Sequence, residues 1–230
     1  MNQLLTQGII LSRTDYGEAD RIITLLTPDH GKLRLMAKGV RRVKSKLAGG
    51  IELFSISHIA FIQGRGEVGT LVSTRLITHY GDIVKDITRV QAGYDLIKVM
   101  NKATEDEPEK EYFVLLNDAF SVLNDASIDL VLIKTWFSAQ LLGLSGHQPN
   151  LQSDAAGSAL NPRATYDFNF DAMAFIEARD GHFAADHIKF IRLLFSPNQP
   201  TILQKIQDSD VLLRDLQPLV QTMLSAHIRL

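Results

Sequence analysis

Residues 32–46 read KLRLMAKGVRRVKSK, an alternating segment that runs directly into a cluster of positive charges. The alternation predicts a strand with Leu33, Leu35 and Ala37 facing a core. The opposite face of that strand would carry Lys32, Arg34 and Lys38. Five of the nine residues that follow from position 38 are cationic: Lys38, Arg41, Arg42, Lys44 and Lys46. No acidic residue lies between Asp29 and Glu52, so the sequence predicts a basic strand face that continues into a basic loop.

Four further segments near this strand are rich in Ile, Leu, Val, Thr and Phe, which favour strands. They span residues 7–13, 21–27, 53–63 and 70–78, and Gly-, Pro- and Asp-containing turns separate them. Five strands within about 80 residues predict a small closed or half-closed barrel such as an OB-fold. An SH3-like barrel is the main competing fold.

After Tyr80 the apolar residues recur at helical spacing. Helices are predicted near residues 87–100, 113–123, 130–144, 185–195, 201–207 and 211–228. The third of these is the most continuously apolar and is predicted to be the central buried helix. Residues 146–170 carry Gly, Pro, Asn, Ser and Asp with little periodicity and are predicted to form an irregular insertion. The chain is therefore predicted to be α+β, with an OB-fold barrel over residues 1–80 and an all-α domain over residues 81–230.

The composition is that of a globular protein, with 45% hydrophobic and 22% charged residues among 230. The formal net charge of −2 conceals an asymmetry. Residues 1–80 contain 11 Lys and Arg against 6 Asp and Glu, whereas residues 81–230 contain 13 against 20. This division favours a basic module that meets polyanions. The sequence contains no cysteine, which excludes disulfides, thiolate metal sites and cysteine nucleophiles. No signal peptide or membrane span is expected, and the predicted compartment is the cytoplasm.

Two patterns could suggest an enzyme. Residues 64–69 read GRGEVG and match the dinucleotide-binding pattern, but a strand-like segment follows them where a helix is needed. We therefore interpret them as a glycine-rich hairpin. Asp180, His182, Asp186 and His187 lie close in sequence, but they match no established metal-ligand or catalytic spacing. We predict no catalytic residues and no bound metal.

The N-terminal motifs resemble those of the RecO family of DNA repair proteins. The matching segments are GIIL at 8–11, YGEAD at 16–20, LLT at 25–27, AKGVRRVKSKL at 37–47 and the glycine-rich segment from Gly64 to Leu71. The resemblance implies an N-terminal OB-fold, a C-terminal helical domain and a recombination mediator that anneals complementary strands. It further implies binding to single- and double-stranded DNA, partnership with RecR and with the C-terminal tail of the single-stranded DNA-binding protein SSB, and loading of the recombinase RecA. A cytoplasmic, nucleoid-associated protein is expected.

Some members of this family hold zinc with two pairs of cysteines. The corresponding positions here are Ser153, Ala156, Ala184 and His187, so the resemblance implies that zinc is lost and that packing holds this region.

The predicted DNA-binding residues are Lys32, Arg34, Lys38, Arg41, Arg42, Lys44 and Lys46. Lys134 is the single charge within residues 130–144 and is the candidate cation for an acidic peptide tail. Two alternatives remain open at this stage. One is a protein–protein scaffold that binds an acidic partner through the basic barrel. The other is an enzyme acting on nucleotides through Asp180, His182 and His187.

Overall fold

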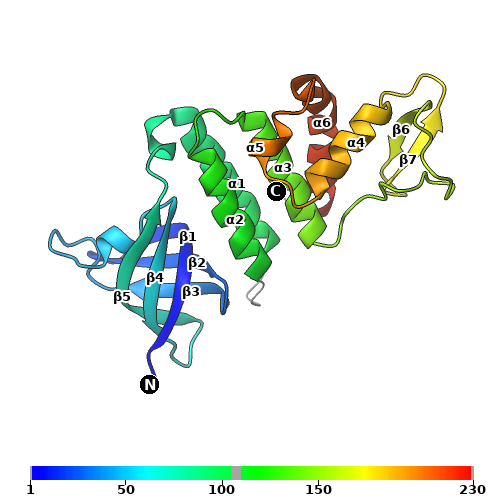
Figure 1. The fold of residues 1–230 in the computed structure, drawn as a ribbon. Helices are drawn as coiled ribbons and strands as arrows, with labels where there is room; N and C mark the ends of the chain where they lie inside the picture. The colour runs from blue at the N-terminus through cyan, green and yellow to red at the C-terminus, as the bar shows by residue number, and fades with distance from the viewer. Residues whose placement is uncertain (1, 105–109, 229–230) are drawn as a thin grey trace. The chain divides into compact units, whose positions relative to one another are not determined.

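The computed structural model describes residues 2–104 and 110–228, which form two compact units divided between Ala126 and Ser127. The first unit begins with five strands that wrap into a closed barrel (Figure 1). These strands are β1 (Leu4–Tyr16), β2 (Asp20–Thr27), β3 (Gly31–Ala37), β4 (Ser55–Ile62) and β5 (Val68–His79). The barrel order is β1-β2-β3-β5-β4, and every neighbouring pair is antiparallel except β3 with β5. The predicted OB-fold barrel is confirmed.

The glycine-rich segment at 64–69 belongs to a hairpin. The strand β4 pairs with β5 in the antiparallel direction, and residues 63–67 connect the two. The backbone therefore turns back on itself here and opens no helix. The interpretation as a hairpin is confirmed, and the dinucleotide-binding alternative is wrong.

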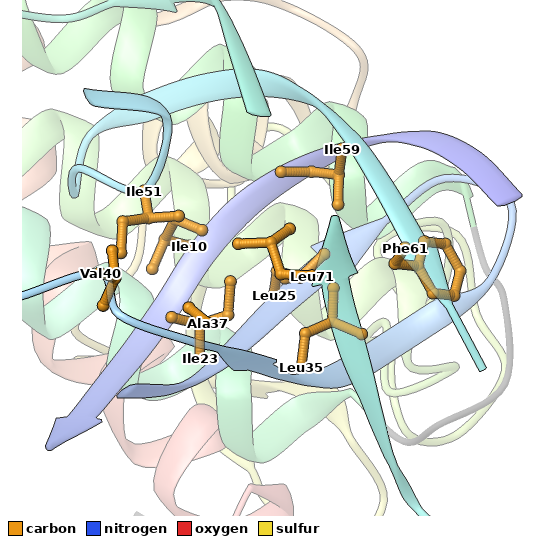
Figure 2. Close-up of a cluster of buried hydrophobic side chains, with 10 residues drawn as sticks. All are labelled: Ile10, Ile23, Leu25, Leu35, Ala37, Val40, Ile51, Ile59, Phe61 and Leu71. Atoms are coloured by element: carbon orange, nitrogen blue, oxygen red, sulfur yellow. The ribbon is translucent and has the colours of Figure 1, made fainter. Parts of the chain in front are cut away.

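The barrel interior is apolar, because the inward-facing residues of all five strands meet there. Figure 2 shows this cluster: Ile10, Ile23, Leu25, Leu35, Ala37, Val40, Ile51, Ile59, Phe61 and Leu71. Two of its members, Val40 and Ile51, come from the long segment between β3 and β4 and not from a strand. Each fully buried Val, Leu, Ile or Phe side chain contributes about 1.5–3 kcal/mol to stability. The β3–β4 segment is therefore held to the barrel at two separate points.

Two helices complete the first unit: α1 (Ile87–Ala103) and α2 (Lys110–Leu123). Asp86 begins α1, because its carboxylate accepts a hydrogen bond from the Thr88 amide at 2.8 Å. The ring of Phe54, just before β4, makes edge-to-face contacts with Tyr94 of α1 and Phe120 of α2. Phe54 is 2% exposed, and its ring joins the barrel to both helices.

The second unit contains four helices and a hairpin: α3 (Leu130–Leu144), β6 (Thr165–Asn169), β7 (Ala174–Ala178), α4 (Ala185–Phe195), α5 (Pro200–Leu203) and α6 (Ser209–His227). The carboxylate of Asp129 accepts a hydrogen bond from the Leu132 amide and begins α3. Most side chains of α3 are buried, including Trp136 and Phe137, which confirms its predicted central position. The helix predicted at 201–207 is shorter in the structure and ends at Leu203.

The prediction of an irregular segment over residues 146–170 is wrong for its last part, because β6 begins at Thr165 and pairs with β7. The two strands are joined by only four residues, and the Asn169 side chain accepts a hydrogen bond from the Ala172 amide in this turn. Strands of five residues show too few apolar alternations to stand out from a loop. The predicted all-α domain therefore contains a two-stranded sheet.

Aromatic rings hold this hairpin together. Phe175 of β7 is fully buried and makes edge-to-face contacts with Tyr166, Phe168 and Phe183 at centroid distances of 6.2, 5.3 and 5.7 Å. Phe183 in turn contacts the ring of His187 at 5.9 Å. Such pairs add about 0.5–1.5 kcal/mol each beyond their buried area. Packing of this kind agrees with what the family resemblance implies for this region.

The change from strands to helices lies between His79 and Ile87, near the domain boundary predicted at residue 80. The compact units divide some forty residues later, because α1 and α2 belong with the barrel. The division of the chain into domains at residue 80 stays a prediction.

Candidate functional site

The basic loop, residues 38–46, is anchored firmly where it leaves β3. Gly39 adopts a φ of 63°, a left-handed conformation that glycine tolerates best. Its amide donates a hydrogen bond of 2.7 Å to the Asp20 carboxylate, and the Arg41 amide donates one of 2.9 Å to the Ala19 carbonyl. Val40 between them is 4% exposed within the barrel core. The turn between β1 and β2 thus holds the start of the loop.

The chain is anchored again immediately after the basic loop. The Thr74 hydroxyl of β5 donates a hydrogen bond of 3.2 Å to the Leu47 carbonyl. Leu47 and Ala48 pack against the barrel core, and Ile51 is 1% exposed within it. A short 3₁₀ helix, Ala48–Gly50, lies between these contacts. Residues 41–46 therefore project from the barrel between two fixed points.

Four cations of the basic loop are exposed and make no hydrogen bond or ion pair through their side chains within residues 2–104 and 110–228: Lys38, Arg42, Lys44 and Lys46. The fifth cation, Arg41, lies 3.5 Å from the Asp15 carboxylate and 3.4 Å from the Gly17 carbonyl, with 38% of its side chain exposed. The loop therefore keeps most of its positive charge available to an external anion.

Asp15 is the acidic residue that limits this charge. Its carboxylate accepts a hydrogen bond of 2.8 Å from the Arg21 guanidinium, and this bond, helped by the nearby charge of Arg41, lowers the pKa of Asp15 below its usual value. Asp15 is therefore ionised at neutral pH, and it neutralises part of the charge of the two arginines.

The two β3 cations of the predicted DNA-binding set have partners within the first unit. The Lys32 ammonium donates hydrogen bonds to the carbonyls of Asn101 and Thr104 at the end of α1, at 3.0 and 2.8 Å. A cation at this position complements the carbonyl end of the helix dipole. Arg34 is more exposed and lies 4.0 Å from Glu67. The ammonium of Lys32 is therefore engaged by the end of α1, whereas the guanidinium of Arg34 remains accessible.

Three other charged residues of the β1–β2 hairpin, Arg13, Asp20 and Arg21, have structural partners. Arg21 pairs with Asp15 at 2.8 Å, whereas Arg13 pairs with Glu52 at 3.0 Å. The Asp20 carboxylate accepts a hydrogen bond from the Gly39 amide. The sequence offers no direct signal for the pairing of Asp20 with a residue 19 positions away.

Aromatic side chains for base stacking are scarce in the barrel. Phe54 and Phe61 are buried, and Tyr80 is half-buried with its hydroxyl on Asn117. Tyr16, at the end of β1, is 56% exposed. The barrel surface thus carries exposed positive charge but few exposed aromatic rings.

Histidines and carboxylates form separate pairs in the second unit. The Nδ1 atom of His182 lies 2.7 Å from Asp167, and this hydrogen bond lowers the pKa of Asp167 below its usual value. The Nε2 atom of His187 lies 3.0 Å from Asp215, and its Nδ1 accepts a hydrogen bond from the Ala184 amide. Among the described residues, no three His, Cys, Asp or Glu side chains gather as metal ligands. His182 and His187 thus face different carboxylates and share no site with each other.

The second unit also contains a groove that sequence reasoning missed. It has a volume of about 560 Å³ and is lined by residues 148–152 together with Arg192, Phe195 and Ser196. The exposed Arg192 side chain donates a hydrogen bond of 2.7 Å to the Leu151 carbonyl. Lys134, the cation predicted for partner binding, is half-buried on α3 and is not among the groove residues. The loop at 148–152 has no periodic pattern, so the sequence could not predict its contact with Arg192, which forms only in the folded chain.

No helix within residues 2–104 and 110–228 has the length and apolar character that a membrane crossing requires.

Two family models together match nearly the whole chain. Residues 1–80 match the family described as recombination protein O N terminal, and residues 85–230 match recombination protein O C terminal.

Curated proteins with similar sequences carry the name DNA repair protein RecO. The protein of Roseiflexus is 34% identical over 71% of this chain and 57% of its own length. The protein of Halalkalibacterium halodurans is 32% identical over 63% of this chain and 57% of its own length, and that of Streptomyces coelicolor is 34% identical over 65% and 63%. The aligned stretch therefore spans less than two thirds of these relatives. With both family regions matched and an OB-fold barrel at its N-terminus, the chain belongs to the RecO family.

Proposed function

We propose that this protein is a non-enzymatic mediator of DNA repair and homologous recombination. It binds single- and double-stranded DNA through the basic loop and anneals complementary strands. With RecR, it helps RecA to load onto single-stranded DNA covered by SSB. Membership of the RecO family supports the role in repair and recombination, and the basic loop supports DNA binding.

The exposed, unpaired cations of the basic loop support this proposal most directly. A cation that contacts a phosphate releases condensed counterions, so binding gains free energy without reading the bases. Lys38, Arg42, Lys44 and Lys46 are exposed on a loop that is anchored at both ends. Because the contacts are with phosphates, the base edges stay free to pair with a second strand. A surface of this kind suits annealing better than sequence recognition.

A salt series tests this proposal. If all four cations contact phosphates, the logarithm of the association constant for poly-dT is expected to fall with the logarithm of salt concentration with a slope of about −2.8. Fluorescence anisotropy of labelled poly-dT between low and moderate salt measures this slope. Annealing of complementary oligonucleotides is measured with the same preparation. Binding that is independent of salt, or binding without annealing, would contradict the proposal.

A second proposal concerns the acidic, apolar-ended tail of SSB. Such a tail needs an apolar groove with a cation at its edge, and the groove beside Phe195 and Arg192 provides both. Lys134 was the candidate from sequence. We expect micromolar binding of an SSB tail peptide, weakened by Arg192→Ala more than by Lys134→Ala. Isothermal titration calorimetry measures both, and heats that stay flat with the unmodified protein would refute this docking.

The scaffold alternative predicts a different outcome in the same experiments. A barrel that only recognises an acidic protein would show no affinity for poly-dT, whatever the salt concentration. The enzyme alternative requires Asp180, His182 and His187 to act together, and the hydrogen bonds of His182 and His187 to different carboxylates do not favour it. Metal analysis and a nuclease assay of the purified protein test it directly.

A further inference from the structure

The tip of the basic loop carries an apolar side chain in an unusual position. Val43 has a relative exposure of 104%, the highest among the bulky apolar residues of the described chain. The Ser45 amide donates a hydrogen bond of 2.9 Å to the Arg42 carbonyl, so Val43 and Lys44 are the central residues of a tight turn. Such central positions favour Gly, Pro, Asn, Asp or Ser. A β-branched apolar residue has no local structural reason to be there.

The chain around Val43 restricts what can cover it. Arg41 and Arg42 precede it, and Lys44 and Lys46 follow it, with no acidic residue between positions 30 and 51. Any partner of Val43 must therefore bring negative charge to both sides of an apolar contact. A DNA strand has this chemistry, because phosphates flank the apolar faces of its bases. Apolar side chains inserted between neighbouring bases are a known means of unstacking them.

The anchoring of the loop makes such insertion effective. The Arg42 amide donates to the Gly39 carbonyl at 3.1 Å, so one turn leads directly into the next. With Val40 buried on one side and Leu47 packed on the other, the tip is held out from the barrel. A loop that is anchored on both sides loses less conformational entropy on binding than a free one.

We propose that Val43 inserts between adjacent bases of single-stranded DNA while the neighbouring cations hold the phosphates. The inference rests on the proposed DNA-binding function and adds a base contact to it. Unstacked bases held in this way would be presented to a complementary strand. An anionic lipid surface has related chemistry, but one valine provides little apolar area for insertion into a membrane.

The experiment uses the full chain and an oligonucleotide with one 2-aminopurine between adenines, whose emission rises when the base unstacks. At saturating protein, we expect the emission to increase by about twofold or more, as a stacked base loses its neighbours. Val43→Ser is expected to lose most of this increase while its affinity falls by no more than about fivefold, since the cations remain. Val43→Leu should keep the increase. Val84→Ser, at another exposed valine of the first unit, is the matched control and should match the unmodified protein.

The outcomes separate the two proposals. If the unmodified protein fails to bind DNA, the proposed function fails and this inference fails with it. If DNA binds with the expected salt dependence but Val43→Ser gives the same emission as the unmodified protein, the inference alone is overturned. Sedimentation with phosphatidylserine vesicles provides a third result. If Val43→Ser abolishes binding to the vesicles but gives the same 2-aminopurine emission as the unmodified protein, the tip contacts membranes and the inference is overturned.

Discussion

Alanine at Lys38, Arg42, Lys44 and Lys46 together is expected to weaken binding of poly-dT by on the order of 500-fold at 0.1 M salt, because four phosphate contacts are lost. The magnitude of the slope of affinity against salt should fall by about 2.8 for the same reason. These side chains are exposed and unpaired within the described chain, so their removal should leave the fold intact. Anisotropy titrations at several salt concentrations measure both quantities, and strand annealing should decline in parallel.

A control variant separates local contacts from total charge. Alanine at Lys98, Lys102, Lys205 and Arg214 removes the same charge from exposed positions on α1, on α6 and in the turn between α5 and α6. It should reduce affinity by less than about tenfold, since exposed charges that do not contact the DNA are largely screened by salt. Lys32→Ala should also have a small effect on affinity, because its ammonium is bound to the end of α1. Equal losses in the loop variant and the charge control would show that the basic loop is not the contact surface.

Phe175→Ala is expected to reduce the free energy of unfolding of the second unit by about 3–5 kcal/mol, because it removes a fully buried ring. The loss also breaks three ring contacts, two within the hairpin to Tyr166 and Phe168 and one to Phe183. The single tryptophan, Trp136, is buried in α3 of the same unit, so its fluorescence during urea unfolding reports on this unit.

Ile176→Ala provides the matched control for this measurement. Ile176 is the next residue of β7 and is 42% exposed, so its truncation should cost less than about 1 kcal/mol. Where Phe175→Ala remains folded, its affinity for poly-dT should be unchanged, because the basic loop belongs to the first unit. An unfolding midpoint of Phe175→Ala equal to that of Ile176→Ala would mean that the aromatic cluster does not stabilise the second unit.

Local patterns were sufficient for the barrel. The alternation at residues 32–38 predicted the inward Leu35 and Ala37, and the glycines at 64–69 predicted a hairpin. These signals depend on neighbours within a few residues, because side chains alternate across a strand and glycine permits tight turns. The hairpin at 165–178 escaped prediction because its strands are too short to show such a pattern.

The sequence alone determined which residue types could form the site: a run of cations without acids, in a chain without cysteine. The tertiary structure decided which of those cations stay available. Lys32 and Arg34 lie on the same face of the predicted strand, yet the ammonium of Lys32 donates its hydrogen bonds to carbonyls at the end of α1. Asp15 of the β1–β2 hairpin lies next to Arg41, and Asp20 of the same hairpin accepts a hydrogen bond from the Gly39 amide at the start of the basic loop. Contacts of this kind join residues about 20 to 70 positions apart. They form only when the whole unit folds, so no local pattern could reveal them.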